Sequence, residues 1–175
     1  MRERDCFEQI VEDYQAMVFR TAMGFVHERE EAEDITQDVF IKAYRKFDQF
    51  RGDSAISTWL YRITVNVALD YVSHKRRKIF VQYGHDMMKK WFDRQDQTQS
   101  AHQQMELSER GQIIRKAIDE LPDKQRTAFI LSRYDDLPQA DIAAIMILSE
   151  GAVEQLLQRA KAKLQKKLQK FVGNI

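Results

Sequence analysis

Apolar residues recur at intervals of three and four positions along nearly the whole chain, which is the spacing of one face of an α-helix. Only two prolines and six glycines interrupt this pattern, and charged residues make up 31% of the sequence. A chain with so few helix breakers is expected to be almost wholly helical. Its 175 residues suffice for one domain or two small ones. The sequence therefore predicts an all-α fold.

Several classes of protein are disfavoured by what the sequence lacks. No apolar run is long enough to span a membrane, and the first residues, MRERDCFEQI, lack the apolar core of a signal peptide, so we expect a cytoplasmic protein without membrane insertion. Cys6 is the only cysteine, which excludes an internal disulfide or a cysteine-based zinc site. The histidines lack metal-ligand spacing and are expected at the surface: His27, His74, His85 and His102. We therefore expect no metal and no cofactor.

The first 78 residues are predicted to form one small helical domain. Apolar periodicity predicts helices over about 5–27, 30–47 and 55–78, which can bury a common core. Residues 79–105 are rich in glutamine and show no clear period, so they are predicted to be a linker with at most a short helix near 87–92. The bulky Trp91 and Phe92 suggest that part of this linker docks on a domain or a partner.

Residues 106–175 are predicted to form a second domain that ends in a helix-turn-helix. Pro122 suits the first turn of a helix that runs to about Tyr134. A helix over 138–146, a tight turn, and a helix over 150–171 follow, with Ser149 as a natural N-cap. This layout places the start of the last helix where it could enter a major groove.

The outward side chains of the last helix suit contacts with DNA. Gln155 and Gln158 can pair with adenine, Arg159 with guanine, and Glu154 can accept from cytosine. The lysines further along suit phosphates, which supply affinity rather than sequence choice. The alternative at this point is a helical hairpin that packs on another protein.

Two motif blocks, in this order, resemble those of the extracytoplasmic-function sigma factors of bacterial RNA polymerase. The first block contains EDITQDVFIKAY (33–44), FRGDSAISTWLYRITVN (50–66) and ALDYVSHKRR (68–77). The second contains LPDKQRTAFIL (121–131), DIA (141–143), the Ser-Glu-Gly-Ala-Val stretch at 149–153, and RAKAKL (159–164). The resemblance implies a non-enzymatic factor that binds RNA polymerase core and promoter DNA. It also implies control by an anti-sigma factor and a monomer when free.

The resemblance assigns the second helix to RNA polymerase core. The side chains that would dock on the clamp of the large polymerase subunit are Asp34, Gln37, Asp38, Phe40, Lys42, Tyr44 and Arg45. An ordinary amphipathic helix would show the same periodicity, so it is the resemblance that decides between the two readings.

The resemblance assigns the loop at 51–57 and the third helix to the proximal (−10) promoter element, which the family reads as melted single strand. A base turned out into a pocket costs a few kcal/mol, which hydrogen bonds and stacking must offset. Phe50 and Trp59 could supply stacking, although core packing is the better role for Trp59. The expected polar contacts are Arg51, Asp53, Ser54, Ser57, Arg62, Asn66, Arg76 and Arg77.

The helix-turn-helix is assigned to the distal (−35) element as duplex DNA, and here the sequence departs from the family. Ile147 stands where the family usually has glycine, so we expect a reshaped turn, because a β-branched residue disfavours left-handed backbone. Glu154 replaces a usual basic residue, which weakens phosphate attraction. The expected contacts are Arg133, Ser149, Glu154, Gln155, Gln158, Arg159, Lys161 and Lys163.

Two other functions remain open from the sequence. A helix-turn-helix regulator that binds an operator as a dimer would account for 106–175, but it has no need of the 33–78 block. A sigma-like interaction protein would bind polymerase or an anti-sigma factor while reading promoters weakly, as the altered recognition helix suggests.

Overall fold

The computed structural model describes residues 2–98 and 109–172, and every element within these ranges is a helix, which confirms the predicted all-α fold. The N-terminal half contains α1 (Arg2–Val26), α2 (Arg29–Lys46), the short 3-10 helix η1 (Phe47–Gln49) and α3 (Ile56–Thr98). The C-terminal half contains α5 (Glu109–Asp119), α6 (Asp123–Arg133), α7 (Gln139–Met146) and α8 (Glu150–Val172). In the part of the chain that is described, no helix has the length and apolar character needed to cross a bilayer.

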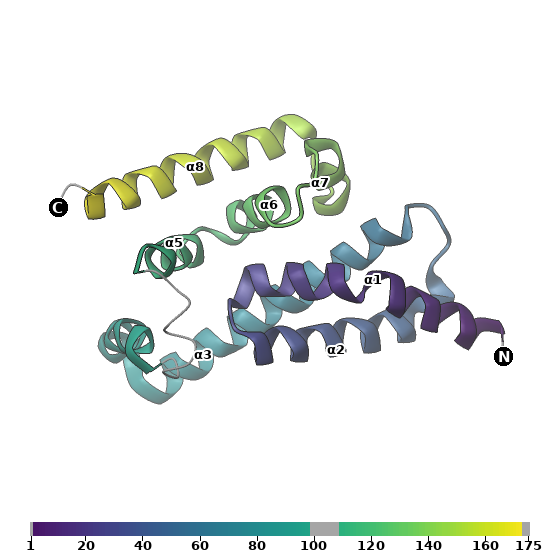
Figure 1. Ribbon diagram of the computed structural model, residues 1–175, viewed down its shortest axis with the longest axis horizontal. Coiled ribbons are helices and arrows are strands. Elements are labelled where there is room, and N and C mark those ends of the chain that lie inside the picture. Colours follow the sequence, from purple (N-terminus) through teal and green to yellow (C-terminus); the bar gives the residue numbers. More distant parts are fainter. Residues whose placement is uncertain (1, 99–108, 173–175) are drawn as a thin grey trace.

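Helices α1, α2 and α3 pack against one another around a common core (Figure 1). On α2 the side chains of Ile35, Val39 and Ala43 are fully buried, so the opposite face of this helix points outward. The corner between α1 and α2 is formed by His27, whose φ of 59° is left-handed and ends α1. The Glu28 side chain then caps α2 by accepting a hydrogen bond from the Glu30 amide.

The third helix is longer than predicted. It continues through Thr98, so the expectation that it ends near Lys78 is wrong, as is the expectation of irregular chain over 79–98. This segment has no proline and one glycine, and many of its residues are good helix formers. The sequence of this segment has no apolar period, so periodicity alone could not identify the helix. The remaining predicted linker residues, 99–105, lie outside the described ranges, as do the side chains of Trp91 and Phe92.

The helix-turn-helix has the predicted boundaries to within a residue, with α7 over Gln139–Met146 and α8 over Glu150–Val172. The Ser149 hydroxyl accepts a hydrogen bond from the Ala152 amide at 3.2 Å, which confirms the predicted N-cap. Val153 and Ala160 are fully buried along the inner face of α8.

The two halves of the protein close on each other. In Figure 1 the layer formed by α5, α6, α7 and α8 lies against α1 and α3, and contacts join α1 to α6 and α3 to α7. One hydrophobic cluster contains buried residues from both halves, including Phe25 of α1 and Ile130 of α6. A Cβ added at Gly24 would lie 2.7 Å from the Ile130 side chain, so the absence of a side chain there permits this approach.

Candidate nucleic-acid interface

The outer face of α2 is open to solvent. Asp34, Gln37, Asp38, Lys42 and Arg45 are all exposed on this face, as the resemblance implies for a docking helix. Exposure alone does not separate a docking face from the solvated side of an amphipathic helix.

Apolar side chains accompany the charges on α2. Tyr44 is 51% exposed and meets Phe7 edge to face, with the ring centroids 5.1 Å apart, whereas Phe40 is half-buried and packs into the core. Ile41 is 49% exposed and was not among the predicted residues. The spacing could have revealed it, because Ile41 lies three positions after Asp38 and therefore on the same stripe.

The loop between η1 and α3 presents polar groups beside an aromatic pair. Gly52 adopts a φ of +74°, which only glycine tolerates readily. Arg51 and Asp53 are exposed, while Ser54 and Ser57 are half-buried. The rings of Phe50 and Trp59 lie 5.1 Å apart at a tilt of 42°, and Trp59 also packs against the core.

Two of the arginines predicted to contact proximal-element DNA form hydrogen bonds to the C-terminal half in this structure. Arg62 donates to the carbonyl of Ala144 in α7 at 2.7 Å, and Arg76 donates to the carbonyl of Asp119 in α5 at 2.8 Å. Asn66 and Arg77 remain exposed on α3. The predicted α3 residues therefore do not form one open surface in this arrangement.

A cleft of about 290 Å³ separates α3 from α6 and α7. The Arg62 Nε is buried there and has no partner among the described residues. The lining residues are Arg62, Val65, Asn66, Leu69, Asp123, Lys124, Thr127, Ile145, Met146, Ile147 and Leu148.

The predicted distal-element side chains are all exposed, and those beyond Ser149 lie along one helix, α8. Arg133 lies in the last turn of α6. Gln158 donates to the Glu154 carboxylate at 3.2 Å, so these two side chains partner each other. Further along α8, the Lys167 ammonium pairs with Glu120 and its pKa is lowered by partial burial and by Lys170.

The turn between α7 and α8 keeps the left-handed geometry that its sequence disfavours. Ile147 has φ 56° and ψ 50° and is 77% exposed, so the expectation of a reshaped turn is wrong. The Leu148 amide donates to the Ala143 carbonyl at 3.0 Å, which is the closing bond of a Schellman cap. The exposed isoleucine side chain meets no clash, so the energetic cost of the left-handed conformation is confined to the backbone.

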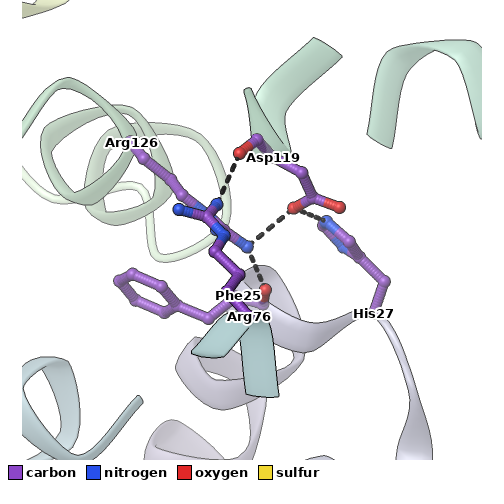
Figure 2. Close-up of polar contacts among 5 residues, drawn as sticks. All are labelled: Phe25, His27, Arg76, Asp119 and Arg126. Atoms are coloured by element: carbon purple, nitrogen blue, oxygen red, sulfur yellow. Dashed lines mark hydrogen bonds and ion pairs between the residues drawn. The ribbon is translucent and has the colours of Figure 1, made fainter. Parts of the chain in front are cut away.

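A polar junction joins α1 and α3 to α5 and α6 (Figure 2). The buried Arg126 donates to the Phe25 carbonyl and, at 2.6 Å, to the Asp119 carboxylate. The His27 ring lies 3.0 Å from the same carboxylate, and its side chain is only 9% exposed. The expectation that His27 is a surface residue is therefore wrong. His102 and the side chain of His85 lie outside the described residues.

Burial shifts the pKa values of the side chains that bridge the two halves. Desolvation lowers the pKa of the Arg126 guanidinium, although Asp119 opposes this effect.

At a second junction the carboxylate of Asp135 accepts hydrogen bonds from Arg20 at 2.8 Å and from Thr21 at 2.9 Å. Burial raises the pKa of Asp135 despite these bonds, and burial together with Asp135 raises the pKa of Tyr61 to about 12. Asp135 therefore joins α1 to the C-terminal half.

None of the described residues form a group of three or more histidine, cysteine or acidic side chains that could hold a metal ion. The arrangement instead offers exposed helix faces, a loop with a paired aromatic platform, and a helix-turn-helix. Exposed faces and loops of this kind are suited to recognising other macromolecules.

Comparison with known proteins identifies both halves of the chain. Residues 10–78 match the family described as Sigma-70 region 2, and residues 111–164 match Sigma-70, region 4. The RNA polymerase sigma-H factor of Pseudomonas aeruginosa is 32% identical, covering 95% of this chain and 88% of its own. The ECF RNA polymerase sigma-E factor of Escherichia coli K12 is 34% identical, covering 97% of this chain and 90% of its own.

Solved structures agree with this grouping. The sigma factor RpoE of Bartonella quintana, solved with the anti-sigma factor NepR, has a TM-score of 0.63 at 25% identity and covers 93% of this chain and 96% of its own. CnrH, solved with the cytosolic domain of CnrY, shares the fold with a TM-score of 0.65 at 23% identity, over 94% of this chain and 88% of its own. The chain thus belongs to the sigma-70 family, as an extracytoplasmic-function sigma factor built from regions 2 and 4.

Proposed function

We propose that this protein works in the cytoplasm, binds RNA polymerase core, and directs promoter-specific initiation of transcription through two DNA-reading units. Residues 1–78 form the unit for core polymerase and the proximal element, and residues 106–175 form the unit for the distal element. The segment 79–105 connects them. The observation that carries this proposal is the presence of region 2 and region 4 in one chain, in that order.

The α2 face would dock on core polymerase. Its exposed charges surround the half-exposed apolar side chains of Ile41 and Tyr44. Such an apolar centre within a polar rim is what a protein interface needs, because a few central anchors supply most of the affinity. Ile41 joins the predicted docking residues in this proposal.

The loop at 51–57 would hold a base of the melted proximal element. The ring of Phe50 beside Trp59 provides a platform for stacking, and the exposed Arg51 and Asp53 provide hydrogen-bonding groups at its edge. Arg62, Asn66, Arg76 and Arg77 would follow the strand along α3.

The exposed face of α8 would read the distal element. Gln155 and Arg159 are free to meet base edges in the first turns, and Lys161 and Lys163 lie further along the helix for phosphates. The pairing of Glu154 with Gln158 supports a smaller role for these two side chains in base reading than their types alone suggest.

A partner of the anti-sigma type would keep the protein silent, as a monomer without polymerase. Support comes from Bartonella RpoE, which was solved in complex with an anti-sigma factor. A partner of this kind would cover the faces that polymerase and DNA require.

Core binding is tested by charge reversal on α2. We expect Asp38→Arg to weaken binding to purified core polymerase at least tenfold, measured by anisotropy of the labelled protein, because it reverses a charge within the proposed docking face, and charge complementarity guides association. Glu12→Arg makes the same change at an exposed site on α1 and should bind as wild type does. Equal affinity for both variants would contradict the assignment of the α2 face.

A further inference from the structure

The start of α1 lies beside the end of α2, because the two helices run in opposite directions (Figure 1). We propose that Phe7 of α1 is a positioning residue, which holds the Tyr44 ring of α2 in the orientation that core polymerase binds. The role in binding rests on the proposed function of the α2 face, whereas the contact between the two rings does not depend on it. Phe7 is only 7% exposed, so it acts through Tyr44 rather than by touching polymerase.

Tyr44 lies where its own helix gives a side chain little support. It belongs to the last turn of α2, which ends at Lys46, and it is 51% exposed. Helix ends open more readily than helix interiors, and an exposed ring can occupy more than one staggered orientation. A binding partner must order such a ring, and ordering a side chain weakens association. A contact that is already made in the free protein removes part of this penalty.

Phe7 supplies a contact of this kind. Its ring meets the Tyr44 ring edge to face, with the ring centroids 5.1 Å apart and an angle of 73° between the planes. It meets the Phe47 ring in the same way, at 5.5 Å and 72°. Edge-to-face pairs are favoured because the positive edge of one ring meets the negative face of the other. Phe7 therefore contacts one ring before the end of α2 and one ring directly after it.

The Phe7 ring is itself fixed by the core. It belongs to a buried cluster with Ile10 of α1, Ala43 of α2 and Leu60 of α3. Side chains in a closely packed core keep to one low-energy orientation, because neighbouring atoms leave little free space. Tyr44 is thus held by a side chain that cannot move without disturbing the packing of three helices.

The Tyr44 ring completes the apolar centre of the α2 face. Ile41, which is 49% exposed, lies three positions before Tyr44, so the two side chains are neighbours on the helix surface. Phe40 is half-buried and packs against the same cluster as Phe7. Through the Tyr44 ring, the proposed polymerase-binding surface depends on α1 as well as on α2.

Replacing Phe7 by leucine tests this role. Phe7→Leu keeps an apolar side chain in the cluster but removes the ring that meets Tyr44. We expect it to weaken binding to core polymerase about fivefold, measured by anisotropy of the labelled protein, because an aromatic pair contributes beyond the area it buries. Melting curves followed by circular dichroism check that each variant is folded at the assay temperature.

Phe19→Leu is the matched control. It makes the same change on α1, about 18 Å further along the helix, at a ring that packs against a different cluster. It removes a ring from the packing of α1 but leaves the contact between Phe7 and Tyr44 in place. We therefore expect Phe19→Leu to bind core polymerase as wild type does.

A double-mutant cycle separates positioning from a general loss of stability. Phe7→Leu should weaken binding about fivefold in the wild-type background and not at all in a Tyr44→Ala background, because no ring is left to position. An equal loss in both backgrounds would show that Phe7 acts through the fold alone, and would overturn the role. Unchanged affinity of Phe7→Leu in the wild-type background would overturn it as well.

A spectrum of the free protein reports on the contact directly. With fluorotyrosine incorporated throughout, the fluorine resonance of Tyr44 is identified by its absence in Tyr44→Phe. We expect Phe7→Leu to shift this resonance and Phe19→Leu to leave it in place. A resonance that does not respond to Phe7→Leu would overturn the inference. Failure of wild type to bind core polymerase would instead contradict the proposed function, and the fluorine spectrum would still decide whether Phe7 fixes the ring.

Discussion

Replacing Ile147 in turn by glycine and by alanine separates the backbone conformation of the α7–α8 turn from the loss of the isoleucine side chain. Both substitutions remove nearly the whole side chain, which is 77% exposed and contributes little burial. They differ in the Cβ, which in left-handed backbone costs about 1–2 kcal/mol. The glycine variant in turn loses about 0.5–1 kcal/mol of stability, because glycine has more conformational freedom in the unfolded chain.

The difference predicts that Ile147→Gly is more stable than Ile147→Ala by about 0.5–1 kcal/mol. The same comparison at Ala162, an exposed residue within α8, should have the opposite sign, because glycine in a helix costs about 1 kcal/mol relative to alanine. Urea unfolding followed by circular dichroism measures both free energies. The melting temperatures should differ by about 1–4 °C at each position.

A glycine variant at position 147 that is less stable than the alanine variant would refute the reasoning. In that case the turn would not be left-handed, and α8 would not leave α7 in the orientation described. The opposite sign expected at Ala162 guards against a general effect of glycine on this chain.

Three further predictions concern the cap, the basic face and a buried phenol. Ser149→Ala should lower the free energy of unfolding by about 1 kcal/mol in urea titrations, because the Ala152 amide loses its partner. Lys161→Ala should reduce the slope of log affinity against log salt for duplex DNA by about one, while Arg29→Ala should leave it unchanged. Tyr61 should ionise near pH 12 in absorbance titrations, a step that Tyr61→Phe removes. Because the folded state holds this proton more tightly, its contribution to stability is present below about pH 10 and is lost as the pH rises through about 12.

Local features of the sequence were enough to predict most of the secondary structure. The helix-turn-helix boundaries follow from Pro138, the Ser149 cap and the apolar face of α8, all of which act within a few residues. The exposed faces of α2 and α8 follow from the same periodicity, because a helix that buries one stripe must present the other. Ile41 was missed although the stripe contained it.

The closure of the two halves was beyond sequence reasoning. Arg126 bonds to a carbonyl 101 positions away, and Thr21 bonds to a carboxylate 114 positions away. No local pattern reports such pairs, so the sequence does not indicate that Arg62 and Arg76 bond to the C-terminal half or that the His27 side chain is enclosed. The length of α3 was missed for a different reason, because the sequence of its last part has no apolar periodicity.

Transcription in vitro tests the central claim most directly. Purified protein, bacterial core polymerase and a pool of genomic promoter fragments are combined, and the transcripts are sequenced at their 5′ ends. A sigma factor that reads two elements should give discrete starts that share two upstream motifs, and these starts should vanish with Asp38→Arg. An absence of starts despite binding to core would contradict promoter reading and favour a sigma-like interaction protein. An absence of core binding, together with specific binding of duplex DNA by a dimer, would favour an operator-binding regulator.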